Sequence, residues 1–122
     1  MKHFMRLQHA PFLAIKSGRK KIEMRLYDEK RSLIKEGDMV EFTDVETSET
    51  LLCKVVCLHR YANFQQLYMR HDKISLGYQE NEEANPLDML AYYPREEVEK
   101  YGVVGIELEL INLKQNQTAE SL

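Results

Sequence analysis

The spacing of apolar residues along the chain changes repeatedly between that of strands and that of helices. Alternating or short apolar runs predict five strands, at residues 3–7, 21–26, 40–43, 51–58 and 104–110. Helical spacing and end signals predict a helix with Pro11 in its first turn, a helix that follows the N-cap Asn63, and two short helices, 87–92 and 95–101, on either side of Pro94. About five strands with three or four short helices predict the α+β class, with the sheet curled into a small barrel that hides its edges.

The length of 122 residues fits a single domain. We assign residues 1–113 to this domain and expect 114–122 to form a flexible C-terminal tail, because that stretch has too few apolar residues to pack. The polar connection at 73–84 is of the kind that often carries function.

Composition excludes several classes of protein. The chain is 43% hydrophobic and 30% charged, close to ordinary globular usage, with 5 Gly and 3 Pro, so collagen-like and low-complexity interpretations fail. Its longest apolar run, residues 51–58, contains Lys54 and is far shorter than the roughly 20 residues that span a bilayer. No apolar signal core follows the N-terminus, so we expect a cytoplasmic protein that does not associate with membranes.

The cysteines and histidines predict neither a disulfide nor a metal site. Cys53 and Cys57 lie four residues apart in a predicted strand, which separates them by roughly 13 Å, beyond disulfide reach. The alternation predicts that both face the same side, in the core. His3, His9 and His71 show no metal-ligand spacing, and we expect no metal and no cofactor.

Charge is distributed unevenly. The net charge is −3, but residues 16–35 hold eight basic and three acidic side chains, whereas residues 72–109 hold three basic and ten acidic ones. Local charge decides where a polyanion binds, so the basic segment predicts a confined anion site. The acidic half leaves a protein-interaction module open as an alternative function.

Candidate ligand-binding residues cluster in the basic segment: Gly18, Arg19, Lys20, Lys21, Glu23 and Arg25. In such a row the cations can bind a phosphate, while Glu23 accepts hydrogen bonds from an exocyclic amine such as that of cytosine. The same row is equally typical of a solvated strand face with ordinary ion pairs. Arg60 and Tyr61 add a cation and a stacking ring, whereas His59 is typical of a strand end. Tyr92, Tyr93 and Tyr101 offer rings that could stack on a base, but tyrosines at helix ends are more typical of half-buried packing residues.

The motif Gly18-x-Lys20-x-x-Glu23-x-Arg25 resembles the signature Gly-x-Lys-x-x-Glu-x-Arg of the ASCH domain family. The resemblance extends over roughly residues 3–111, through the helix before Gly18, the Gly37-Asp38 turn and the Tyr93-Pro94 step before the last strand. It implies a PUA-like β-barrel of about five or six strands, association with RNA, and a motif that lines a cleft between barrel and helices.

The resemblance also raises the question of catalysis. Some family members are amidohydrolases that deacetylate N4-acetylcytidine, and others have been proposed to cleave RNA. The threonine nucleophile of the amidohydrolases is replaced here by Glu23, so a hydrolase would need Glu23 as general base and Lys20 as oxyanion stabiliser. Of the acidic residues in the connection, Glu80 looks like the best counterpart of the further catalytic glutamate, and Glu82 and Glu83 lie close by as alternatives. The sequence thus predicts a domain that binds RNA or a modified nucleoside in a basic cleft, with a hydrolase or ribonuclease as the alternative.

Overall fold

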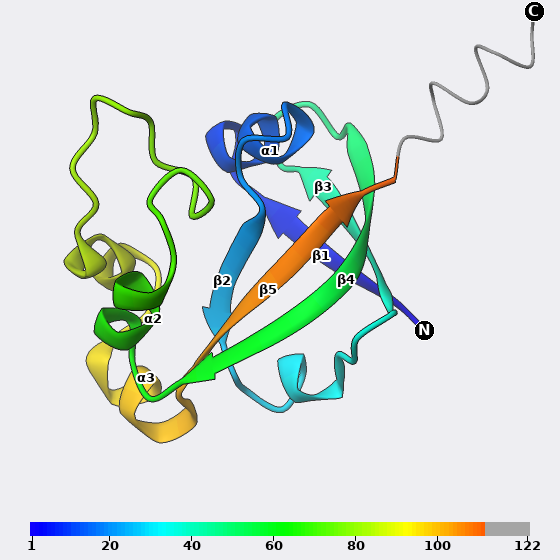
Figure 1. Cartoon of the computed structure of the whole chain (residues 1–122). Helices are drawn as coiled ribbons and strands as arrows, with labels where there is room; N and C mark the ends of the chain where they lie inside the picture. Colours follow the sequence, from blue (N-terminus) through cyan, green and yellow to red (C-terminus); the bar gives the residue numbers. More distant parts are fainter. Residues whose placement is uncertain (112–122) are drawn as a thin grey trace, which may run out of the picture.

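The computed structural model describes residues 1–111, and the tail expected at 114–122 lies outside the described residues. One five-stranded sheet forms the centre of the molecule, in the order β1-β3-β4-β5-β2 (Figure 1). Its strands are β1 (Lys2–Leu7), β2 (Ile22–Leu26), β3 (Met39–Asp44), β4 (Thr50–Tyr61) and β5 (Val103–Leu110). β1 pairs with β3 in parallel, and the other neighbours are antiparallel.

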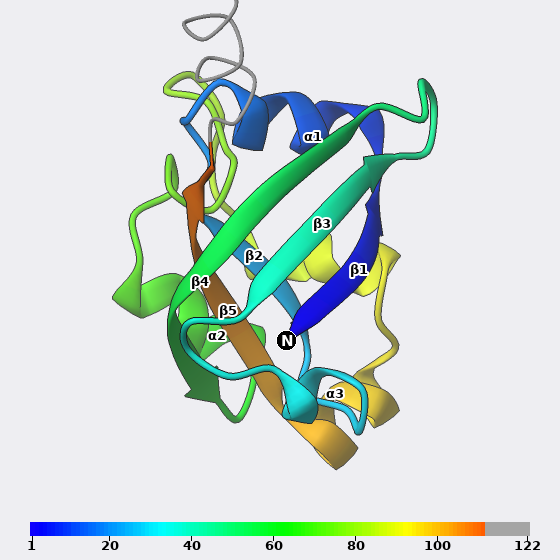
Figure 2. The same cartoon turned by 90° about the vertical axis from the view of Figure 1, so that its right-hand side faces the viewer.

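The sheet curls into a half-barrel, which leaves β1 and β2 as its two edges (Figure 2). A side chain spans the split between them, because Nη2 of Arg25 on β2 donates a hydrogen bond of 2.9 Å to the carbonyl oxygen of Arg6 on β1. The α+β class and the small PUA-like fold with five strands are therefore confirmed.

Short helices cover the sheet on one side and at its ends. α1 (His9–Lys16) lies over one end of the half-barrel, and α2 (Phe64–Arg70) and α3 (Arg95–Tyr101) lie beside β2 and β5 (Figure 1). Two 3-10 helices complete the fold, η1 (Arg31–Leu33) and η2 (Pro86–Ala91). The predicted helix at 87–92 is thus a 3-10 helix. Among residues 1–111, no helix is long and apolar enough to cross a membrane.

Two apolar clusters hold these layers together. The first fills the half-barrel and includes Phe12, Phe42 and Ile106, none of which is exposed to solvent. The second packs the sheet against the helices and includes the apolar residues of β2 together with Phe64 and Leu67 of α2. β2 therefore turns its apolar face towards the helices, and its polar face points towards the split edge.

A β-bulge in β4 overturns the prediction that Cys53 and Cys57 face the same side. Val55 pairs with Leu108, and Cys57 pairs with Glu107, the residue just before Leu108 in β5. Val56 is therefore an extra residue in β4. A bulge of this kind inverts the alternation of side chains beyond it. Cys53 lies in the core and is fully buried, whereas Cys57 lies on the outer face and is only half-buried.

Asp38, in the turn before β3, gives the fold a measurable dependence on pH. His3 Nε2 lies 2.8 Å from its carboxylate, and the backbone N–H of Lys35 donates to it at 3.0 Å. These hydrogen bonds lower the pKa of Asp38 from 3.8 to about 2. Because the folded-state pKa is below the unfolded one, this stabilisation is complete above about pH 4 and is lost as the pH falls further.

We expect Asp38→Asn to be less stable than the wild-type protein at neutral pH and to lose less stability between about pH 4 and pH 2. Urea unfolding followed by circular dichroism at a series of pH values measures both effects. Two proteins with the same pH dependence over that range would contradict the assignment.

Candidate functional site

A pocket of about 810 Å³ opens at the split edge of the half-barrel. Its walls come from the end of β1, the first turn of α1, β2, the connection between α2 and η2, and η2 itself. Four cationic and three acidic side chains line it, together with four tyrosines: Arg6, Arg19, Lys20 and Arg25; Glu23, Glu82 and Asp88; Tyr68, Tyr78, Tyr92 and Tyr93.

Lys20 is placed in the pocket wall by two glycines. Gly18 has a φ of +84°, a conformation that glycine adopts without strain, and it ends α1 so that the Lys20 N–H can donate to the carbonyl of Ala14. Gly77, with a φ of +110°, lies over the stem of Lys20, and a Cβ there would come within 3.1 Å of Lys20 Cδ. The Lys20 side chain is 6% exposed, and its ammonium donates to the carbonyl oxygen of Leu76 at 2.9 Å.

Glu23 is held between two cations. Its Oε1 lies 3.4 Å from Lys20 Nζ, and its Oε2 accepts a hydrogen bond of 2.6 Å from Arg25 Nε. Only 8% of the Glu23 side chain is exposed, so the alternative of a solvated row of ion pairs is wrong for this residue. Because Arg25 also reaches Arg6 on β1, the three side chains form a chain of contacts from the turn after α1 across β2 to the opposite edge.

The charges of this chain support one another. Burial disfavours ionisation of Glu23, but Lys20 and Arg25 outweigh it and hold the pKa of its carboxyl below the ordinary value. Burial lowers the pKa of Lys20, and the attraction of Glu23 opposes that shift. A carboxylate with a lowered pKa and two bound cations is a weak proton acceptor, so the arrangement suits recognition better than general-base catalysis.

The pocket is also lined by residues that no sequence pattern predicted. Arg6 is exposed at the end of β1, and it makes no ion pair among residues 1–111. Across the pocket, the hydroxyl groups of Tyr68 and Tyr78 lie 2.9 Å apart, and the Tyr78 hydroxyl donates to Asp88 at 2.6 Å. No local pattern marks these residues, since four separate segments of the chain supply them.

Arg19 and two of the predicted packing tyrosines also line the pocket. The Arg19 guanidinium donates to the carbonyl oxygens of Gly77 at 2.8 Å and Tyr78 at 3.1 Å, which fixes the connection over the pocket. Tyr93 stacks on Phe64 and is partly buried, as predicted for a packing residue, but Tyr92 is 62% exposed.

Other predicted residues lie away from the pocket. Lys21 is exposed and precedes β2, where its N–H donates to the carbonyl of Ser75. The guanidinium of Arg60 stacks on Tyr27, with its Cζ atom 3.8 Å from the ring centroid. The Tyr61 hydroxyl lies 2.9 Å from His71 Nε2. Gly18 positions Lys20 but does not line the pocket, and Tyr101 is absent from its wall as well.

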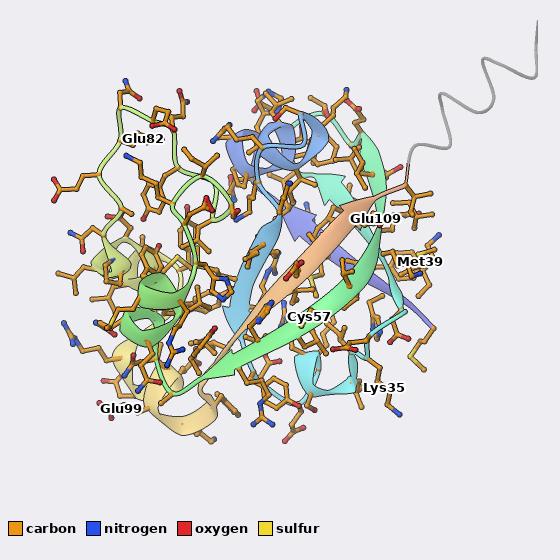
Figure 3. All side chains as sticks on the ribbon, viewed as in Figure 1. Lys35, Met39, Cys57, Glu82, Glu99 and Glu109 are labelled. Carbon is orange, nitrogen blue, oxygen red and sulfur yellow. The ribbon has the colours of Figure 1, made fainter. Side chains whose placement is uncertain are left out.

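The acidic residue that the connection contributes to the pocket is not Glu80. Glu80 is exposed and outside the pocket wall, and its carbonyl oxygen accepts a hydrogen bond of 2.8 Å from Lys73. Glu82 lines the pocket instead, and its carboxylate accepts from the N–H of Gln79 at 2.7 Å. Figure 3 shows Glu82 on this connection.

Comparison with known proteins identifies the family. Residues 5–112 match the family model described as the ASCH domain, and the chain belongs to that family. No curated protein matches the chain.

Two solved structures of similar length have the same fold. The hypothetical protein PH0355 is 36% identical, with a TM-score of 0.76 over 91% of this chain and 100% of its own. Protein PF0455 from Pyrococcus furiosus is 33% identical, with a TM-score of 0.68 over 92% of this chain and 99% of its own. The ZmASCH S128A mutant protein from Zymomonas mobilis is 13% identical, with a TM-score of 0.56 over 99% of this chain and 80% of its own, and it shows likeness of fold alone.

Proposed function

We propose that this ASCH domain binds RNA by enclosing one unpaired nucleotide in the pocket at the split edge. Four cations and four tyrosines line one space of about 810 Å³, and this composition is the main support for the proposal. Phosphates are bound by guanidinium groups, and unstacked bases are bound by aromatic rings, so this combination fits a single-stranded nucleotide.

Each wall has its own part in recognition. Arg6 is exposed at the entrance and free to meet a phosphate. Tyr92, which is 62% exposed, offers a ring for stacking. Deeper in, Glu23 is ionised and accepts only, so it selects a donor edge such as the exocyclic amine of cytosine or adenine.

Hydrolysis is less well supported than binding. Both oxygens of Glu23 are paired, Oε1 with Lys20 and Oε2 with Arg25. A general base must have a pKa close to the working pH. Despite its burial, Lys20 and Arg25 hold the pKa of Glu23 below the ordinary value, so the carboxyl does not meet this condition. Lys20 in turn is committed to Leu76 and Glu23.

The test is the affinity for a short, labelled, single-stranded RNA, measured by fluorescence anisotropy. We expect Arg6→Ala and Tyr92→Ala each to weaken binding by about tenfold, the loss of one phosphate contact or one stacked base. Arg70→Ala is the matched control, because Arg70 is exposed and outside the pocket wall. The affinity should fall only gently with salt, with a logarithmic slope of about −1 to −2.

Equal affinities of Arg6→Ala, Tyr92→Ala and the wild-type protein would place any RNA elsewhere on the surface. Competition by free cytidine or N4-acetylcytidine shows whether the base alone fills the pocket. The wild-type protein is also tested for release of acetate from N4-acetylcytidine and for cleavage of the RNA. If either activity occurs and Glu23→Gln abolishes it, the protein is a hydrolase and the binding proposal is replaced.

A further inference from the structure

The bulge in β4 brings three metal-binding side chains together on the outer face of the sheet. Cys57 is the direct cross-strand neighbour of Glu107, and His59 follows two residues later on the same face. Figure 3 shows Cys57 on β4 where that strand runs beside β5. None of the three lines the pocket, so this cluster is separate from the proposed RNA site.

The distances fit a single small cation. One potential ligand atom from each of the three residues lies within 4.8 Å of the other two, and His59 Nε2 is 2.8 Å from Glu107 Oε1. Ligands of a tetrahedral zinc ion are about 3.3–3.8 Å apart, given Zn–S of about 2.3 Å and Zn–N or Zn–O of about 2.0 Å. The observed separations, 2.8 Å for one pair and at most 4.8 Å for the others, lie on either side of this range.

The surroundings favour a cation and hold one ligand in place. The carboxylates of Glu36 and Glu107 lie close to the Cys57 thiol, so the surroundings of the cluster are negatively charged. The ring of His59 packs edge-on against that of His71, with centroids 4.6 Å apart. His71 is itself hydrogen-bonded to Tyr61, which restrains the orientation of His59.

We propose that Cys57, His59 and Glu107 bind one zinc ion, with a water molecule as the fourth ligand. A thiolate, an imidazole and a carboxylate form a donor set that zinc accepts and that magnesium or calcium does not. On binding, the thiol proton of Cys57 passes to solvent, and two metal–ligand bonds replace the hydrogen bond between His59 and Glu107. The fourth position is open because Glu107 is 41% exposed and His59 is 26% exposed.

The experiment uses the chain without an affinity tag, treated with a chelator and then titrated with Co²⁺ as a spectroscopic substitute for zinc. We expect one equivalent to bind with a thiolate-to-cobalt charge-transfer band, and zinc to displace it. Cys57→Ala should abolish the band, and His59→Ala should weaken cobalt binding at least tenfold. Cys53→Ala is the control and should keep the band, because Cys53 lies in the core.

A second measurement needs no variant. In the wild-type protein, alkylation of Cys57 followed by peptide mass analysis should slow at least tenfold when zinc is added, while Cys53 stays unreactive in the folded protein. Absence of saturable cobalt or zinc binding at about 100 µM would overturn the proposal. A band that survives Cys57→Ala, or alkylation that zinc does not slow, would do so as well.

Discussion

Replacing Lys20 by methionine is expected to lower the free energy of unfolding by about 3–5 kcal/mol, the range found when one partner of a buried ion pair is removed. The Lys20 side chain is 6% exposed and Glu23 is 8% exposed, so water does not replace the lost ammonium. Leu76 also loses the donor for its carbonyl oxygen. Urea unfolding followed by circular dichroism measures the change.

Two controls separate the charge from the packing. The double variant Lys20→Met with Glu23→Gln should recover at least about 1 kcal/mol of the loss, because it removes the stranded carboxylate as well. Lys21→Met changes the neighbouring, exposed lysine and should stay within about 0.5 kcal/mol of the wild-type protein. If Lys20→Met lowers the free energy of unfolding by no more than Lys21→Met does, the buried ion pair does not stabilise the fold.

Replacing Arg25 by methionine is expected to lower stability by about 3 kcal/mol and to weaken RNA binding at least tenfold. The first effect follows from the loss of its 2.6 Å contact with Glu23 and of its hydrogen bond to Arg6 across the split edge. The second follows from its place in the pocket wall. Denaturation and RNA titration on the same preparation measure both.

Arg25→Lys tests whether shape or charge matters at this position. Lysine keeps the charge but cannot bond Glu23 and the Arg6 carbonyl at once through a planar fork, so we expect a partial loss of stability. In Arg25→Met and Arg25→Lys, the backbone amides of β1 should exchange faster than in the wild-type protein, because the hydrogen bond from Arg25 to Arg6 is lost. A wild-type exchange pattern in Arg25→Met would show that this side chain does not hold the edges together.

The strands and helices followed from the sequence because their signals are local. Asn63 does cap α2, accepting a hydrogen bond of 2.9 Å from the Gln66 N–H. The alternation at residues 21–26 also predicts a strand, which the structure shows as β2. What it could not show is that α2 covers the apolar face and that Lys20 and Arg25 enclose Glu23 on the polar face.

The candidate site was predictable only in its central motif. Lys20, Glu23 and Arg25 lie close together in the chain, and their grouping needed no knowledge of the fold. Arg6 and Tyr78 reach the pocket from segments far from that motif, and nothing in their neighbouring residues distinguishes them. The bulge at Val56 was equally hidden, since its presence depends on the register with β5.

The position of β2 at an edge of the sheet has a consequence for how the protein is made. Among the described strands, β2 pairs only with β5, and Ile22 lies opposite Glu107, near the far end of the described chain. Contacts between such distant segments form late, because the intervening chain must first be brought into place. During synthesis on the ribosome, the motif at residues 18–25 can therefore pair with β5 only after almost all of the described chain has been made. Binding of a ligand by that motif would then report completed folding.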